Sequence, residues 1–270
     1  MVYLRVMNVF EAILLGLIQG FTEFIPISSS GHLVIAQTLL SGASNHLFLE
    51  WINVGTVLAL LIFFRARIMI IARSVVVDRD YRLLGRIMLA TLPAGLVGFL
   101  LADFIGSNPF FGSVWTVVVM LIAVGVLLIL LERLPKLSSV KVLESLSWRR
   151  ALGIGIAQML ALIPGTSRSG ITMAAGRLSG LERPVAAEFS FLISIPIMLG
   201  VILKLLINDT DVAYLMENFS SLLIANVAAF ASGMFAVGFL MRFLKNRSLA
   251  LFGWYRIGLA VVIAAVLLLQ

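Results

Sequence analysis

Six long apolar runs dominate the pattern of hydrophobic and polar positions along the chain. An α-helix needs about 20 residues to cross the roughly 30 Å hydrocarbon core of a bilayer. Each run is long enough, so we expect six membrane-spanning helices. The runs cover residues 47–64, 83–105, 114–131, 185–207, 219–241 and 249–269.

Four further apolar segments are too short or too polar to span a membrane. They form two pairs, and a turn rich in serine and glycine joins the members of each pair. Irregular backbone at membrane depth needs protein or water around it, because lipid offers no hydrogen-bond partner. We therefore interpret each pair as two re-entrant half-helices, over residues 9–40 and 150–179.

The two pairs belong to an internal repeat. Residues 19–31 read QGFTEFIPISSSG and residues 158–170 read QMLALIPGTSRSG, so both carry Gln, then Ile-Pro, then hydroxyl residues and Gly. A long apolar run with a Glu near its start follows each pair, with Glu50 in one copy and Glu188 in the other. Each copy contains three spans, and an odd number inverts the second copy in the membrane.

The sequence thus predicts an all-α polytopic membrane protein with an inverted repeat. Each repeat holds one re-entrant half-helix pair plus three transmembrane helices, giving six full spans and two re-entrant pairs. The first repeat covers residues 9–131 and the second 150–269, joined by a basic cytoplasmic linker at 132–149. We expect residues 1–270 to form a single membrane domain.

Composition supports the membrane interpretation and narrows the chemistry. The chain is 61% hydrophobic and 12% charged, whereas soluble domains carry about 25% charged residues. Without cysteine, disulfides, Fe–S clusters, thiolate zinc sites and a cysteine nucleophile are excluded. The net charge of +7 would suggest nucleic acid in a soluble protein, but here it indicates topology, and we expect no nucleic-acid partner.

The positive charges alternate between loops. Residues 65–86 hold six arginines, 132–150 hold five Lys or Arg, and 242–247 hold three, whereas 103–113 and 208–218 hold none. Basic loops face the cytoplasm. We therefore expect a multi-pass protein of the bacterial inner membrane with both termini outside the cytoplasm, in contact with membrane lipids. The polar tips of the two pairs would then meet near the midplane.

The tips have the chemistry of an anion site. Pro26 and Pro164 end the incoming half-helices, and hydroxyl residues suited to N-caps begin the outgoing ones. Two helix N-termini with free N–H groups favour phosphate, and the fork of Arg168 can hold two phosphate oxygens. The expected substrate-binding residues are Arg168, Ser167, Ser169, Thr166, Ser28, Ser30 and Gly170.

Three residues of the first pair add reactive groups. Gln19 and Glu23 are four residues apart and share a helix face, where their oxygens could hold Mg²⁺ or Ca²⁺. His32 lies just after the serine cluster, one turn from Ser28 and Ser29, so a hydroxyl and an imidazole lie within reach as nucleophile and base. Together with Arg168, these groups predict phosphoryl transfer.

These motifs resemble those of the bacterial undecaprenyl-diphosphatase family, the bacitracin-resistance type of integral membrane phosphatase. The resemblance rests on residues 22–32, 164–170 and 188–192 and runs through nearly the whole chain. It implies hydrolysis of undecaprenyl diphosphate to undecaprenyl phosphate and phosphate on the outer side of the inner membrane. The recycled lipid carrier then serves peptidoglycan synthesis.

The resemblance also implies roles for single residues. It makes Ser29 and His32 the catalytic pair, Glu23 a catalytic and metal-binding carboxylate, and Arg168 the phosphate-binding arginine. Gln19 stands where the family has Glu or Gln, so here a metal would depend more on Glu23. Dependence on a divalent cation is likewise implied by the resemblance.

Alternatives stay open at this point. Inverted repeats with broken helices also suit a polyprenyl-phosphate flippase or an anion transporter, and a metal-bound water could replace Ser29 as nucleophile. Glu188 could orient the opposite tip as an outer-shell residue or only complement its helix dipole. The sequence leaves open the accepted prenyl chain lengths and a homodimer.

Several polar residues have structural explanations. We expect the tip serines to cap helices and Gln158 to form a hydrogen bond between helices. Arg256, beside Trp254 and Tyr255, is expected to reach the cytoplasmic interface. Glu11 is expected to face water at the outer boundary.

Overall fold

The computed structural model describes residues 8–40, 46–134 and 140–269, and the folded elements in these ranges are helical. Six helical stretches are long and apolar enough to cross a membrane, which confirms the predicted number. The first combines α3 (His46–Trp51) and α4 (Asn53–Phe63). The others are α6 (Arg82–Leu100), α9 (Val114–Leu131), α12 (Arg183–Leu206), α14 (Phe219–Asn246) and α15 (Ala250–Leu268).

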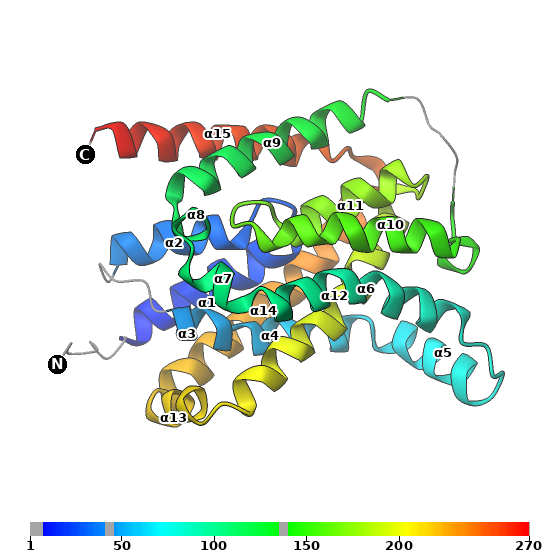
Figure 1. Cartoon of the computed structure of the whole chain (residues 1–270), viewed down its shortest axis with the longest axis horizontal. Coiled ribbons are helices and arrows are strands. Elements are labelled where there is room, and N and C mark those ends of the chain that lie inside the picture. The colour runs from blue at the N-terminus through cyan, green and yellow to red at the C-terminus, as the bar shows by residue number, and fades with distance from the viewer. Residues whose placement is uncertain (1–7, 41–45, 135–139, 270) are drawn as a thin grey trace.

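Two pairs of shorter helices accompany these spans, as predicted, one before the first span and one between α9 and α12 (Figure 1). The first pair is α1 (Val9–Phe24) and α2 (Ser29–Leu40). The second is α10 (Trp148–Gln158), prolonged by the 3-10 turn η2 (Met159–Leu162), and α11 (Arg168–Leu178). Hydroxyl-rich turns separate the members of each pair. How the pairs lie relative to the two membrane surfaces stays a prediction.

Short helices make the remaining connections. They are α5 (Arg65–Val76), α7 (Ala102–Ser107), α8 (Pro109–Gly112), η1 (Leu143–Ser145) and α13 (Asp209–Glu217). The apolar run 83–105 was expected as one span, but α6 ends at Leu100 and α7 begins at Ala102. Hydropathy alone therefore placed the end of this span too late.

Each repeat packs its first short helix against a membrane span of the other repeat. The short helix α1 packs along α14 of the second repeat, and α10 packs along α6 of the first. The last spans, α9 and α15, pack on each other. Figure 1 shows that α1 and α10 run in opposite directions, as do α9 and α15. This antiparallel arrangement is the one that an inverted repeat predicts.

Glycine allows the short helices to approach the spans closely. A Cβ atom at Gly20 of α1 would lie 2.0 Å from the Ser232 hydroxyl and 2.3 Å from the Ala229 carbonyl oxygen of α14. At Gly155 of α10 a Cβ atom would lie 2.6 Å from the Ala90 carbonyl oxygen of α6. At both positions, the absence of a side chain lets a short helix pack closely against a span of the other repeat.

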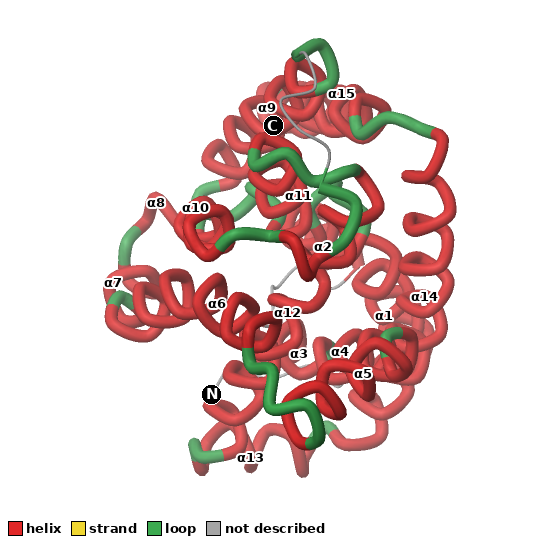
Figure 2. Tube along the Cα trace, turned by 90° about the vertical axis from the view of Figure 1, so that its right-hand side faces the viewer, coloured by secondary structure: helices red, strands yellow, loops and turns green. Residues whose placement is uncertain are grey.

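The two ends of the bundle differ in charge. The arginine-rich helix α5 lies at the right-hand end in Figure 1, together with the start of α10 and the end of α14. The acidic helix α13 and the short helices α7 and α8 lie at the opposite end, where α1 begins and α15 ends. The helix α11 packs against both α9 and α12, and Figure 2, turned by 90°, shows α2 and α11 near the middle of the bundle.

Candidate active site

The turns of the two helix pairs have the same local structure. Ser28 has φ 75° and Ser167 has φ 68°, a left-handed conformation that non-glycine residues rarely adopt. Each stands directly before the outgoing helix. The hydroxyl oxygens of Ser28 and Ser30 lie 3.2 Å apart, and those of Ser167 and Ser169 also lie 3.2 Å apart. The repeat is thus preserved in the backbone and in side-chain contacts, and we call these turns the first and second tip (residues 25–31 and 163–170).

The two tips touch each other, as expected. The Gly165 N–H donates to the Ser30 hydroxyl at 3.3 Å, and the Ser169 hydroxyl lies 3.4 Å from the Ile25 carbonyl oxygen, to which it donates. Ser167 accepts a hydrogen bond from the Gly170 N–H at 3.2 Å, which is the predicted N-cap of α11.

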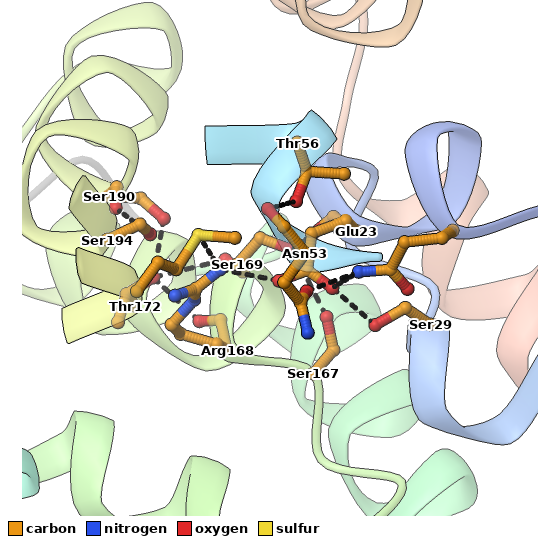
Figure 3. A network of polar contacts seen from close by, with 12 residues as sticks. Glu23, Ser29, Asn53, Thr56, Ser167, Arg168, Ser169, Thr172, Ser190 and Ser194 are labelled. Carbon is orange, nitrogen blue, oxygen red and sulfur yellow. Dashed lines mark hydrogen bonds and ion pairs between the residues drawn. The ribbon is translucent and has the colours of Figure 1, made fainter. Parts of the chain in front are cut away.

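Glu23 is the centre of the polar contacts between the tips (Figure 3). Its Oε1 accepts a hydrogen bond from Arg168 Nη2 at 2.5 Å. Its Oε2 accepts one from the Ser29 hydroxyl at 2.6 Å and one from Gln19 Nε2 at 3.2 Å. In the repeat, Ser29 and Arg168 occupy equivalent positions. One carboxylate therefore holds the first residue of both outgoing helices.

Arg168 combines this ion pair with strong burial. The exposed fractions of the Arg168 and Glu23 side chains are 15% and 13%. Arg168 Nη2 also donates to Met198 Sδ at 3.2 Å, whereas Arg168 Nε is buried and has no partner in the described part of the chain. An ion pair with so little water around it is strengthened by the low local dielectric. An anion that replaces Glu23 at Arg168 would meet the same conditions.

A row of hydroxyl groups anchors the helix that carries Arg168. The Thr172 hydroxyl donates to the Arg168 carbonyl oxygen at 2.7 Å and lies 2.6 Å from the Ser190 hydroxyl of α12. The Ser194 hydroxyl donates to the Ser190 carbonyl oxygen at 2.7 Å. Figure 3 shows this row leading from α12 to Arg168. It fixes the first turn of α11 against a membrane span.

Asn53 supports Gln19 and was missed by the sequence analysis. Its Oδ1 accepts a hydrogen bond from Gln19 Nε2 at 2.5 Å, and its Nδ2 donates to the carbonyl oxygens of Leu49 and Glu50. These partners fix the orientation of both amides. The only sequence signal was a lone amide within an apolar run.

A cavity of about 250 Å³ opens beside these groups. Glu23, Ser29 and Arg168 all face it, so a carboxylate, a hydroxyl and a guanidinium share one space. The cavity is bounded by the first and second tips and by α6, α10 and α12, and its lining residues are Glu23, Ser29, Ser30, Ala94, Gln158, Ala161, Leu162, Ile163, Ser167, Arg168 and Ile197.

His32 is held away from this group. Its Nδ1 lies 2.7 Å from the Ser28 carbonyl oxygen and its Nε2 lies 2.8 Å from the Tyr255 hydroxyl. Within the described residues, no hydrogen bond joins His32 to Ser29, and His32 does not line the cavity. The expected nucleophile and base pair is therefore not formed in this structure, and a base role for His32 stays a prediction.

The expectation for Arg256 is wrong. This residue is fully buried, and its guanidinium donates to the carbonyl oxygens of Pro26, Gly165 and Thr166 at 3.3, 2.6 and 3.0 Å. It thereby joins the two tips, and it also reaches two carbonyls of α9, at Met120 and Leu121. The available signal was the arginine itself, because a charged residue inside a membrane span is by default functional.

Glu11 is also placed differently from the expectation. Its exposed fraction is only 5%, and it forms a capping box with Asn8 at the start of α1. Gln158 behaves as expected, since its Nε2 donates to the Ala90 carbonyl oxygen of α6 at 3.1 Å.

The remaining predicted residues lie in or near the tips, except Glu188. Thr166 is fully buried, and its hydroxyl has no partner among the described residues. Glu188 on α12 pairs with Arg67 of α5 at 2.8 Å, and Arg67 also pairs with Glu144 at 2.8 Å. These ion pairs join α5, η1 and α12. An orienting role of Glu188 toward the tips stays a prediction.

The donor set around Glu23 fits a cation that arrives with a phosphate ligand. The described residues hold no group of three or more carboxylate or histidine side chains that could bind a metal by themselves. However, Gln19 Oε1 is buried without a partner among these residues, and Mg²⁺ often uses one or two carboxylates plus substrate phosphates. Glu23 and Gln19 would hold such a cation.

Comparison with known sequences decides the family. The sequence model described as "Bacitracin resistance protein BacA" matches residues 12–262, which include both tips. The chain belongs to this family. A relative from Parvibaculum lavamentivorans is 39% identical over 93% of this chain and 93% of its own. One from Clavibacter michiganensis subsp. michiganensis is 38% identical over 97% of this chain and 97% of its own. A relative from Sulfurihydrogenibium sp. is 36% identical over 95% of this chain and 98% of its own. All three family members are named undecaprenyl-diphosphatase.

Proposed function

We propose that this protein is an undecaprenyl-diphosphatase, which hydrolyses undecaprenyl diphosphate to undecaprenyl phosphate and phosphate. One observation carries the proposal: the Glu23 carboxylate binds the Ser29 hydroxyl and the Arg168 guanidinium beside a single cavity. The names of the family members support the same substrate. The apolar prenyl chain stays in the lipid while the diphosphate enters the cavity.

Binding of the diphosphate changes the partner of Arg168. The guanidinium can take two phosphate oxygens, which a single carboxylate oxygen does not match. Arg168 then leaves Glu23 and neutralises the charge that develops on the terminal phosphate. The free N–H groups at the start of α11 add to this stabilisation. Glu23 keeps the Ser29 hydroxyl as a hydrogen-bond partner when Arg168 leaves.

Ser29 then acts as the nucleophile. Its hydroxyl already donates to Glu23 at 2.6 Å, so the proton passes to the carboxylate as the oxygen attacks the terminal phosphorus. The bond from this phosphorus to the bridging oxygen breaks, and the proton passes from Glu23 to the departing undecaprenyl phosphate. Glu23 next takes a proton from water, which attacks the phosphoserine and releases phosphate. The proton returns to Ser29.

The proposal includes a divalent cation and a membrane orientation. A cation held by Glu23 and Gln19 would withdraw charge from the diphosphate, and phosphate release should then fall on addition of EDTA and return with Mg²⁺ or Ca²⁺. We place the basic end of the bundle in the cytoplasm of the bacterial inner membrane. A periplasm-dependent reporter fused to the C-terminus should then be active. The homodimer stays a prediction.

Phosphate release from undecaprenyl diphosphate in detergent tests the proposal. Glu23→Gln keeps the shape of the side chain but cannot accept the proton, and we expect at least about a 100-fold loss of kcat. Glu50→Gln is the matched control, because Glu50 pairs with His46 and does not contact the tips. Acid-quenched reactions with substrate labelled on the terminal phosphate should leave label on Ser29. Near-normal turnover of Glu23→Gln would overturn the site.

The flippase alternative shares the antiparallel repeats but not the reacting groups. Lipid transport needs a polar path, whereas the contact of a hydroxyl, a carboxylate and a guanidinium favours chemistry. Vesicles that contain the Ser29→Ala variant separate the two functions. Movement of labelled undecaprenyl phosphate across their bilayer would show transport without hydrolysis.

A further inference from the structure

Both ring nitrogens of His32 are occupied. Nδ1 lies 2.7 Å from the Ser28 carbonyl oxygen, and a carbonyl oxygen can only accept, so Nδ1 carries the proton. In the neutral ring Nε2 is therefore the acceptor, and the Tyr255 hydroxyl donates to it at 2.8 Å. The two ring planes differ by only 8°. His32 is thus fixed in one tautomer and one orientation.

The partner of Nδ1 is part of the strained first tip. Ser28 has φ 75°, and its hydroxyl contacts that of Ser30, which receives the Gly165 N–H of the second tip. The ring of His32 therefore holds the carbonyl group of the residue that directly precedes Ser29. A serine in the left-handed conformation is strained and keeps this conformation only when its surroundings enforce it.

The partner of Nε2 comes from α15, which also holds the second tip. Tyr255 and Arg256 are adjacent, and the Arg256 guanidinium binds the carbonyl oxygens of Pro26 and Gly165. Two neighbouring residues of one membrane span are thus linked to the first tip. The Arg256 side chain binds the backbone of the tip, and Tyr255 is linked to it through His32.

We infer that His32 and Tyr255 form a positioning pair that holds Ser29 against Glu23 and that His32 does not act as the base. This inference rests on the proposed function, because it concerns the same reaction. Ser29 already has Glu23 as its proton acceptor, and His32 neither contacts Ser29 nor lines the cavity. His32 acts on the reaction through the Ser28 carbonyl.

Two substitutions of His32 separate positioning from base catalysis. The amide nitrogen of His32→Asn stands close to the place of Nδ1 and can donate to the Ser28 carbonyl, but it cannot accept a proton near neutral pH. We expect His32→Ala to lower kcat about 100-fold and His32→Asn to recover at least tenfold of that loss. Equal losses in both variants would show that the imidazole is the base and would overturn the inference.

Tyr255→Phe removes one hydroxyl and keeps the ring. We expect kcat to fall about five- to tenfold with KM changed less than twofold, because the substrate contacts are intact. In the His32→Asn background the same change should have no further effect, since the shorter amide does not reach the hydroxyl. Additive losses contradict a pair. Tyr81→Phe, on an exposed tyrosine before α6, is the matched control.

Nuclear magnetic resonance of the histidine nitrogens tests the contact without activity. The chain has two histidines, so His46→Gln leaves the signal of His32 alone in ¹⁵N-histidine-labelled protein. We expect a protonated Nδ1 and an Nε2 whose resonance moves in Tyr255→Phe toward that of a nitrogen without a hydrogen bond. An unmoved Nε2 resonance would overturn the inference. A wild-type protein that folds but releases no phosphate would instead refute the proposed function, while this readout still decides the contact.

Discussion

Replacement of Arg256 by methionine should separate the two tips. Arg256 is the one side chain described here that contacts backbone of both tips as well as α9, with distances of 2.6 to 3.3 Å. Methionine fills similar space but donates no hydrogen bond. The carbonyl groups of Pro26, Gly165 and Thr166 would then stay buried without these donors.

The expected cost follows from the number of lost contacts. A hydrogen bond that involves a charged group contributes about 1.5–3 kcal/mol, so three tip contacts would give about 4.5–9 kcal/mol if they were additive. Contacts from one side chain are not additive, and each buried carbonyl group left without a donor costs about 1–3 kcal/mol, so the lower part of this range applies. We therefore expect the free energy of unfolding to fall by about 3–5 kcal/mol.

Thermal unfolding in detergent, followed by the fluorescence of the four tryptophans, measures this loss. The melting temperature should fall by roughly 6–20 °C, at about 2–4 °C per kcal/mol. Arg242→Met is the control, because Arg242 is exposed and its Nε donates only within its own helix, to Gly238. A melting temperature of Arg256→Met within about 2 °C of the control would refute the assignment of Arg256 as the tie between the tips.

Two further predictions concern the second tip and the basic end. Gly165→Ala should lower the free energy of unfolding by at least about 1–2 kcal/mol, because Gly165 has φ +89° and a Cβ atom would lie 2.7 Å from the Val117 backbone. Gly153→Ala is the control, because Gly153 is at an open helical position. This change should leave the melting temperature equal or higher. Burial acts to raise the pKa of Glu132, but hydrogen bonds from Arg183 and the Leu249 N–H, with nearby arginine charges, outweigh it and leave the pKa below its usual range. The stability that the lowered pKa of Glu132 contributes is present above the unfolded-state pKa of about 4.3 and is lost as the pH falls through the folded-state pKa. The difference in melting temperature between wild type and Glu132→Gln should therefore shrink from pH 7 to pH 4, and a constant difference contradicts the shift.

The membrane spans and the tips were predictable because their signals are local. A run of apolar residues is sufficient to indicate a span, and the shared pattern around Pro26 and Pro164 indicated two equivalent turns. The contact between the tips followed from inversion of the repeat. The proximity of Glu23, Ser29 and Arg168 was also within reach, because each motif concentrates its polar residues in a few positions.

Other features depended on contacts between distant parts of the chain. Arg256 lies 230 residues from Pro26, and its direction is set by how α15 rotates against α9, which hydropathy does not determine. Tyr255 reaches His32 and Asn53 reaches Gln19 for the same reason. The sequence by itself determined which residues enter the membrane and where the chain breaks there. Only the tertiary structure decided which of those residues meet, because helix packing fixes the rotation of each span and hence the partner of every buried polar group.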